Sequence, residues 1–476
     1  MSKQVPERSA QWLERISLRC CAWSERWIPD AYVFAALAVI IVAIAAVALG
    51  APVMQTAKAF GDGFWSLIPF TMQMSFIIIG GYVVASSPPA ARLIDKLAAF
   101  PNSGRGAVCW VAAISMIFSL LHWGLSMILG SLLVRALARR RELDMDYRAA
   151  GAAAYLGMGS VWAMGLSSSA AQLQANPASM PPALLQITGV IPFTDTIFLW
   201  QSVALTAVLI VVTLVIAWLT TPRGHNAQTA QRMAIAVETP TLASTAPPTR
   251  PGEWLEHNPL LNVLVAALGA AWLIQEFTTK GVALAISNLN TYNFLFVMLG
   301  LLLCWRPRVF LDTTARSVSS VSGVLIQFPF YGGIAAILTA APGSDGQSIA
   351  HHLSTFFAQA ATRESFPVVM GIYSAVLGFF VPSGGGKWII EAPYVMQAAN
   401  ELKVHLGWAV QVYNAAEALP NLINPFWMLP LLGILKLRAR DVIGFTMIQF
   451  IVHVPLVLLL LWAFGLTLEY RPPVMP

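Results

Sequence analysis

The chain has 476 residues, of which 57% are hydrophobic and only 11% are charged. A soluble protein carries about a quarter charged residues, so this composition excludes an ordinary soluble domain. The net charge of +6 does not indicate nucleic-acid binding, because the basic residues flank apolar runs and form no single patch.

The N-terminal segment precedes the first apolar run. Residues 7–28 mix arginine and glutamate with tryptophan and leucine at helical spacing. This pattern is typical of an amphipathic helix, so we expect segment 1–30 to lie on the cytoplasmic face of the membrane. The cysteines have no metal-binding or redox spacing, and we interpret them as reduced apolar residues. They are Cys20, Cys21, Cys109 and Cys304.

Apolar runs long enough to cross a bilayer recur along the chain, which predicts an all-α polytopic membrane protein. Full spans are expected at 31–50, 64–86, 149–176, 196–219, 259–275, 282–305, 317–341, 408–435 and 442–468. Two further apolar regions, 106–138 and 366–399, are each too long for one span. LHWGLS interrupts the first and VPSGGGKW the second. We interpret both regions as re-entrant hairpins.

Charge and order support this topology. Basic clusters lie at both ends of the first hairpin, and a single crossing would place one of them outside. The order span, hairpin, interrupted span, span occurs twice, with the hairpins entering from opposite faces, which is the pattern of two inverted-topology repeats. We expect a cytoplasmic N-terminal segment 1–30, a first repeat 31–219 with hairpin 106–138, a cytoplasmic linker 220–258, and a second repeat 259–476 with hairpin 366–399.

The second hairpin carries the stretch FFVPSGGGKWIIEAPY, whose tip we place at Ser383, Gly384, Gly385 and Gly386, between half-length helices 366–380 and 387–399. Glycine permits close backbone approach, the amides of the following helix can bind an anion, and the preceding carbonyls can hold a cation. A kink that only packs helices is the alternative. Lys387 either contacts an anion or pairs with Glu391, one turn away. Glu391 itself is expected to be structural.

The first hairpin presents His122, Trp123, Gly124 and Ser126 at its tip. His122 is either a proton carrier or a core histidine with satisfied hydrogen bonds. Each hairpin is followed by a span with a polar interruption. In the first of these, Ser167 and Ser168 can unwind the helix beside Gly165.

In the second interrupted span, polar residues recur every three or four positions beside two prolines that break helical hydrogen bonds. We expect these polar residues to share one face and to form the wall of a site, with interhelical contact as the alternative. They are Asn414, Glu417, Asn421 and Asn424.

Five motifs resemble the short-chain fatty acid transporter family, over residues 15–468: FGDGFW (60–65), MQMSFIII (72–79), VLIQFPFYGGI (324–334), VPSGGGKW (381–388) and NPFWMLP (424–430). The resemblance implies a secondary carrier of small monocarboxylates, such as butyrate or acetoacetate, in the bacterial inner membrane. It points to Ser383, Gly384, Gly385, Gly386, Trp388, Glu417, Asn421 and the Trp123–Gly124 pair as site residues. The chain departs from the family pattern at His122, Lys387 and Glu391.

Alternatives remain within and beyond transport. A cation/proton antiporter or a dicarboxylate carrier could use the same scaffold, but a dicarboxylate needs a second anion-binding centre besides Lys387. A channel suits paired hairpins less well than alternating access does. An intramembrane enzyme is disfavoured, because GLSSSA does not match G-x-S-x-G and H-E-x-x-H does not occur.

The coupling ion and the partners follow from the same residues. Protons would use Glu417 or His122, whereas sodium would use hairpin carbonyls with Ser383, Asn421 and Asn424. We favour the proton, because its two carriers are explicit in the sequence. No cofactor, dedicated metal site or nucleic-acid partner is expected. The lipid bilayer is the partner that composition implies, and a homodimer stays open.

Overall fold

The computed structural model describes residues 7–177, 180, 182–237, 242, 247–282, 285, 288–318 and 321–474. Four predicted regions therefore lie partly outside the described residues. These are the N-terminal segment, the linker (238–241 and 243–246) and the spans expected at 282–305 and 317–341.

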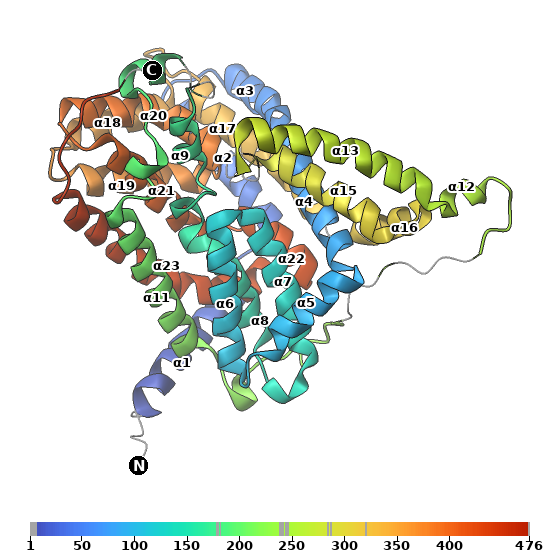
Figure 1. Ribbon diagram of the computed structural model, residues 1–476. Coiled ribbons are helices and arrows are strands. Elements are labelled where there is room, and N and C mark those ends of the chain that lie inside the picture. The colour runs from blue at the N-terminus through green and yellow to red at the C-terminus, as the bar shows by residue number, and fades with distance from the viewer. Residues whose placement is uncertain are drawn as a thin grey trace.

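The first half of the chain is helical throughout its apolar runs (Figure 1). Serine and aspartate caps and prolines in first turns set several of the helix starts, as at Ser103, Asp146 and Pro88. The helices are α1 (Glu7–Trp27), α2 (Ala31–Ala48), α3 (Val53–Ser66), α4 (Ile68–Ala85), α5 (Pro88–Ala99), α6 (Gly104–Leu121), α7 (Trp123–Arg139), α8 (Tyr147–Leu156), α9 (Ser169–Ala175), α10 (Pro182–Thr188) and α11 (Trp200–Thr220).

The second half repeats much of this order. A short helix leads into a long one, and a helical hairpin, a broken helix and a long final helix follow. The helices are α12 (Glu253–His257), α13 (Pro259–Lys280), α15 (Leu289–Cys304), α16 (Pro307–Ser317), α17 (Ser322–Ala340), α18 (Ile349–Ala360), α19 (Phe366–Phe380), α20 (Gly384–Glu401), α21 (Leu406–Asn421), α22 (Leu429–Leu435) and α23 (Ala439–Gly465).

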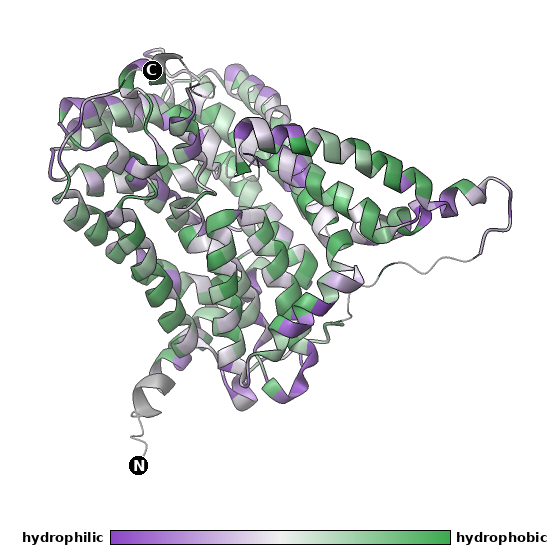
Figure 2. Ribbon diagram, in the orientation of Figure 1, coloured by the Kyte–Doolittle hydropathy of each residue, from purple (hydrophilic) through white to green (hydrophobic). Residues whose placement is uncertain are grey.

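Eight helices in the described part of the chain are long and apolar enough to cross a membrane, and the bent pair of α21 with Phe426–Leu435 makes a ninth. Figure 2 shows apolar residues along most of these helices. The all-α polytopic fold is therefore confirmed. By length and composition α6 also qualifies as a span, so re-entry of the first hairpin stays a prediction.

Both expected hairpins are pairs of helices in contact. His122 alone separates α6 from α7, and the two helices pack side by side (Figure 1). Residues 381–383 separate α19 from α20. Both expected interruptions are present as well. A π-helical turn (Gly157–Val161) and a 3-10 turn (Trp162–Met164) follow α8, and α21 is bent by 74° relative to the helix that follows it.

Helices α13, α15 and α16 form an arm that leaves the main body beside α4 (Figure 1). Its outer surface is apolar, and Leu264, Leu268 and Ile274 on α13 are all more than half exposed. Such a surface is stable against lipid tails but not against water. The arm therefore fits the predicted bilayer partner.

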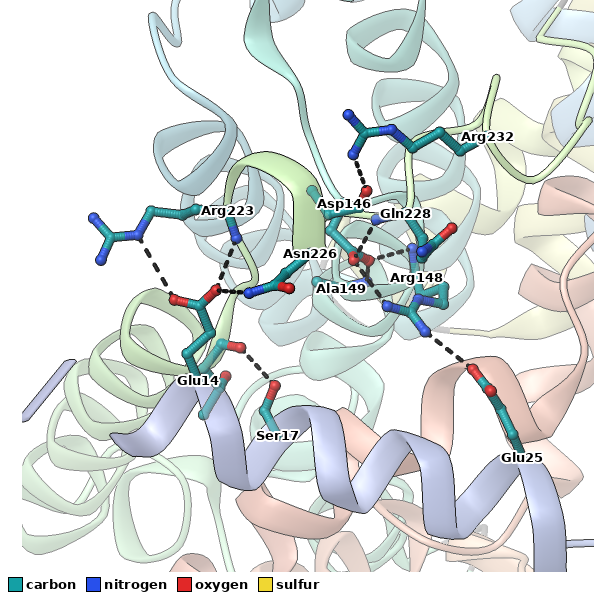
Figure 3. A network of polar contacts seen from close by, with 12 residues as sticks. Glu14, Ser17, Glu25, Asp146, Arg148, Ala149, Arg223, Asn226, Gln228 and Arg232 are labelled. Carbon is teal, nitrogen blue, oxygen red and sulfur yellow. Dashed lines mark hydrogen bonds and ion pairs between the residues drawn. The ribbon is translucent and has the colours of Figure 1, made fainter. Parts of the chain in front are cut away.

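Helix α1 packs against α11 and α23, so its buried face meets protein, whereas the sequence predicted a helix on the membrane face. Polar contacts fix this position (Figure 3). Glu14 lies 3.3 Å from the Arg105 guanidinium, and the Ser17 hydroxyl donates to the Thr220 carbonyl at 2.7 Å. Arg148 joins Glu25 on α1 to Asp146, at 3.0 and 3.1 Å. This network ties the N-terminal helix to the first half of the chain, and the Ser24 hydroxyl, which donates to the Arg440 carbonyl at 2.9 Å, ties it to the second half.

Candidate functional site

The tips of the two hairpins and the breaks in the two broken helices meet inside the protein. Trp123 begins the second limb of the first hairpin, and its ring centroid lies 5.1 Å from that of Trp427, in the second broken helix. Trp162, in the first broken helix, lies 6.4 Å from Trp427. A Cβ placed on Gly384, at the start of α20, would lie 2.4 Å from the Trp162 ring. We call the region around Trp123, Trp162, Gly384 and Trp427 the junction.

Hydrogen bonds join the two broken helices beside the junction. The Tyr155 hydroxyl donates to the Asn421 carbonyl at 2.8 Å. The Ser168 hydroxyl donates to the Asn414 side-chain oxygen, also at 2.8 Å. These bonds cross between the two halves of the chain and fix how the interruptions face each other.

Several buried polar groups near the junction have no hydrogen-bond partner among the described residues. The Asn421 side chain is fully buried, and neither its nitrogen nor its oxygen is paired. The indole N–H groups of Trp162, Trp388 and Trp427 are buried and unpaired in the same way. A buried polar group without a partner costs about 1–3 kcal/mol. Such groups are expected where a polar ligand binds.

The second hairpin differs from the prediction at its tip. The three glycines form the first turn of α20, whereas the sequence placed them in irregular backbone before a helix starting at Lys387. The reason is a cap, since the Ser383 hydroxyl accepts the Gly386 N–H at 3.2 Å. First-turn N–H groups have no acceptor within a helix, so this end of α20 suits an anion.

The glycines are not equivalent. Gly384 lies against Trp162, whereas a Cβ on Gly385 would make only an ordinary contact with Ser169, at 3.4 Å. The Tyr413 hydroxyl donates to the Gly384 carbonyl at 2.5 Å, and the Tyr413 ring lies 4.6 Å from that of Trp388. Close approach at the tip therefore rests on Gly384.

Lys387 is fully buried and ion-paired. Its Nζ lies 3.0 Å from Glu391 Oε1 and 2.7 Å from Glu417 Oε2, and it donates to the Ser374 carbonyl at 2.8 Å. The Ser374 hydroxyl donates to the other oxygen of Glu391 at 2.6 Å. Of the two alternatives for Lys387, this geometry favours ion pairing. Glu391 belongs to the same group as Glu417, which the sequence did not indicate.

His122 acts as the N-terminal cap of α7. Its Nδ1 accepts the N–H groups of Gly124 and Leu125, at 3.1 and 3.3 Å, so the ring proton is on Nε2. The ring stacks on Tyr292, with centroids 3.9 Å apart. Because a second proton on Nδ1 would break both cap bonds, the geometry favours a core histidine over a proton carrier. Its hydrogen bonds are only partly satisfied, since Nε2 is buried and has no hydrogen-bond partner among the described residues.

Other predicted residues serve the packing of the hairpins. The Ser126 hydroxyl donates to the Ser115 carbonyl at 2.7 Å, and the Ser167 hydroxyl donates to the Ser119 carbonyl at 2.5 Å. Gly124 is buried against the ring of His122. These residues shape the first hairpin without offering free polar groups to the junction.

Asn424 does not share a face with the other polar residues of its span. Helix α21 ends at Asn421, and Asn424 lies in the bend that follows. Its Nδ2 donates to the Phe379 carbonyl at 2.7 Å, and its Oδ1 accepts the Phe426 N–H at 3.0 Å. The expected stripe is therefore limited to α21, because the proline-containing bend redirects the chain.

Two residues of the junction, Trp162 and Trp427, were missed by sequence reasoning. The available signal was their position inside the two interruptions, in GSVWAMGL and NPFWMLP. Among the described residues, no group of three or more His, Cys, Asp or Glu side chains could hold a metal ion.

The membrane-length helices include two hairpins and two broken helices, which meet at a buried, partly polar junction. This architecture is that of a multi-pass membrane transporter. The chain belongs to the short chain fatty acid transporter family, whose model matches residues 12–464. The match spans both halves and every residue of the junction.

Relatives extend over nearly the same length. A protein of Escherichia coli (strain K12) named for short-chain fatty acid transport is 32% identical over 432 residues, covering 90% of this chain and 95% of that protein. One of the same name from Haemophilus influenzae is 29% identical over 451 residues, covering 93% and 98%. Among solved structures, the chain is similar to MtrF of Neisseria gonorrhoeae, which is described as illuminating a class of antimetabolite efflux pumps. The two share 13% identity with a TM-score of 0.41, and the match covers 96% of this chain and 100% of that one.

Proposed function

We propose that the protein carries small monocarboxylates, such as butyrate or acetoacetate, across the bacterial inner membrane by alternating access. Its N-terminus is cytoplasmic, and a cation moves with the substrate in the same direction. The two halves are inverted repeats, divided as 31–219 and 259–476, and their hairpins enter from opposite faces. Family membership and the recurring order of hairpin, broken helix and long helix support this arrangement.

The observation that carries the proposal is the set of unpaired N–H donors in an aromatic junction. The indoles of Trp162 and Trp427, the amide of Asn421 and the first turn of α20 can all donate to carboxylate oxygens. Phe426 packs against Trp427, with ring centroids 5.0 Å apart, so an apolar wall lies beside these donors. A carboxylate head with a short hydrocarbon tail matches both features.

Charge favours a monocarboxylate over a dicarboxylate. Lys387 is occupied by two carboxylates and a carbonyl, so it offers no free positive charge to a second anionic group. Neutral N–H donors and a helix N-terminus can hold one carboxylate. Desolvating a second carboxylate without a cation would be far more costly.

Energetics favour a co-transported cation for uptake. An anion moving inward against a negative-inside potential is opposed by about 2.3 kcal/mol per 100 mV. One cation per monocarboxylate makes the cycle electrically neutral. The cell could then accumulate the acid without working against its own membrane potential.

Competition for uptake tests the substrate class. Purified protein in liposomes should take up radiolabelled butyrate with saturation, above the rate of protein-free vesicles. Unlabelled acetoacetate should compete, and succinate at the same concentration should not. Equal competition by succinate would contradict the monocarboxylate assignment, and non-saturable uptake would contradict transport of this class altogether.

A further inference from the structure

Helices α19, α20 and α21 enclose a charged group that the junction does not use. Lys387, Glu391 and Glu417 are all 0% exposed, and the two carboxylates contact the same ammonium group. If all three side chains are ionised, the group carries one net negative charge. Burying an uncompensated charge is costly, and the group becomes neutral when one carboxylate binds a proton.

Glu417 Oε1 is the atom where that proton fits. It is buried and has no hydrogen-bond partner among the described residues, whereas Oε2 of the same side chain faces Lys387. Glu391 differs, because one of its oxygens accepts from Ser374 and the other faces Lys387. The oxygen of this group that lacks both a hydrogen bond and an ion pair is therefore on Glu417.

A sodium ion does not suit this position. The Lys387 ammonium already lies between the two carboxylates, where a metal cation would bind, and it would repel a second cation. A proton adds to one oxygen and removes the negative charge without displacing the lysine. This group is therefore suited to a proton and not to a sodium ion.

Other titratable groups on the surrounding helices leave this balance unchanged. Tyr373 of α19 and Tyr413 of α21 are the neutral titratable neighbours that face the carboxylates. Helices α9 and α10, which also pack against α20, have no titratable side chain in SAAQLQA and PALLQIT. Titratable groups of the adjacent α17, α18 and α23 contact other partners, namely Tyr331 with Asn424, His351 with Tyr394, His352 with Asp345, and His453 with Thr213.

We propose that Glu417, held beside Lys387 and Glu391, binds the proton that is co-transported with the substrate. This inference rests on the proposed function and identifies its coupling ion and site. Tyr413 links the two places, because its ring lies 4.4 Å from Lys387 Nζ and its hydroxyl donates to Gly384 in the junction. The proton comes from water on one side of the membrane and returns to water on the other.

Two transport modes of the same liposomes separate this inference from the proposed function. Exchange of internal unlabelled for external labelled butyrate at equal pH needs a working substrate site but no net proton movement. Net uptake driven by an inward proton gradient needs the coupling site as well. Protein-free vesicles are subtracted in both modes, because protonated butyrate crosses lipid unaided.

Glu417→Gln is the decisive variant, because glutamine is neutral and cannot release a proton. Its exchange rate should stay within about twofold of that of the unaltered protein. The stimulation of its net uptake by the pH gradient should fall at least tenfold. Glu401→Gln is the matched control, since this glutamate ends α20, the helix that carries Lys387 and Glu391, is exposed and should change neither mode. If Glu417→Gln is not recovered folded, Glu391→Gln removes one negative charge from the same group. Glu417 and Lys387 then balance each other without a bound proton, so exchange should be kept and stimulation by the pH gradient lost.

Each outcome decides the inference. Full stimulation by the pH gradient in the folded glutamine variant would exclude Glu417 as the coupling site. If a sodium gradient drives butyrate uptake by the unaltered protein and a pH gradient does not, the choice of ion is overturned and the proposed function stays intact. Absence of exchange in the unaltered protein would overturn the proposed function, and this inference with it.

Discussion

Trp162 and Trp427 lie on different halves of the chain, and their rings meet with centroids 6.4 Å apart. Each belongs to the interruption of a broken helix, so this contact brings the two helix interruptions together. Irregular backbone at membrane depth is stable only when protein or a water-filled cavity surrounds it. The pairing of these interruptions explains how both can exist in one membrane protein.

Alanine at Gly384 should impair transport far more than alanine at Gly385. The added methyl at Gly384 would lie 2.4 Å from Trp162 and force the hairpin away from the junction, whereas at Gly385 it makes an ordinary contact. We expect at least a tenfold loss of butyrate exchange for Gly384→Ala and less than a twofold change for Gly385→Ala. Equal activity of the two variants would show that the glycines serve only packing.

Removal of the His122 cap should reduce stability without changing the coupling ion. Leucine at this position cannot accept the N–H groups of Gly124 and Leu125, and lost caps cost about 0.5–2 kcal/mol. Asparagine can accept them and should restore most of the stability. Thermal unfolding in detergent measures this difference. A loss of pH-driven uptake in a stable His122→Asn variant would instead favour a proton carrier at this position.

Glu14→Gln should destabilise the attachment of α1. The change leaves Arg105 buried and deprived of its charged partner, and breaking a buried ion pair costs about 3–5 kcal/mol. Asp62→Asn breaks the pair with Lys58, which is exposed, and should cost less than about 1 kcal/mol. Comparison of the two unfolding temperatures tests whether α1 is an integral part of the fold. An equal, small effect would mean that its docking contributes little.

Cysteine labelling tests the membrane topology. Single cysteines at Asn102 and Glu142, both exposed at the ends of the first hairpin, should react with an impermeant reagent from the cytoplasmic side. Cysteines at Glu364 and Lys403, exposed at the ends of the second hairpin, should react from outside. The native cysteines are first replaced by alanine. Labelling of one hairpin's two ends from opposite sides would rule out re-entry for that hairpin.

The sequence predicted the parts of this fold that depend on local composition. Apolar length located the helices, and proline and glycine located the interruptions. The cap at Ser383 shows where prediction from composition ends. The three glycines suggested irregular backbone, but the hydrogen bond of the Ser383 hydroxyl places them in the first turn of α20. A side-chain hydrogen bond of this kind competes with propensity at the scale of a single turn.

Long-range contacts could not be predicted in the same way. The spacing in the sequence predicted Glu391, one turn after Lys387, as a partner of the lysine. It could not predict Glu417, which reaches the same ammonium group from another helix. Hydropathy likewise describes the two sides of α1 without saying whether the buried side meets lipid or protein. Both questions depend on how helices pack, which one sequence does not encode locally. The same reason hid the meeting of Trp162 with Trp427.

The central claim is that a carboxylate binds to unpaired N–H donors at the junction, and phenylalanine at Trp427 tests it most directly. This change removes the indole N–H and keeps an aromatic ring, while Trp218→Phe makes the same change at an exposed position on α11. A hydrogen bond to a charged group contributes about 1.5–3 kcal/mol, so the KM for butyrate exchange should rise about tenfold or more in Trp427→Phe. It should stay unchanged in Trp218→Phe. An unchanged KM in a folded Trp427→Phe variant would contradict the account.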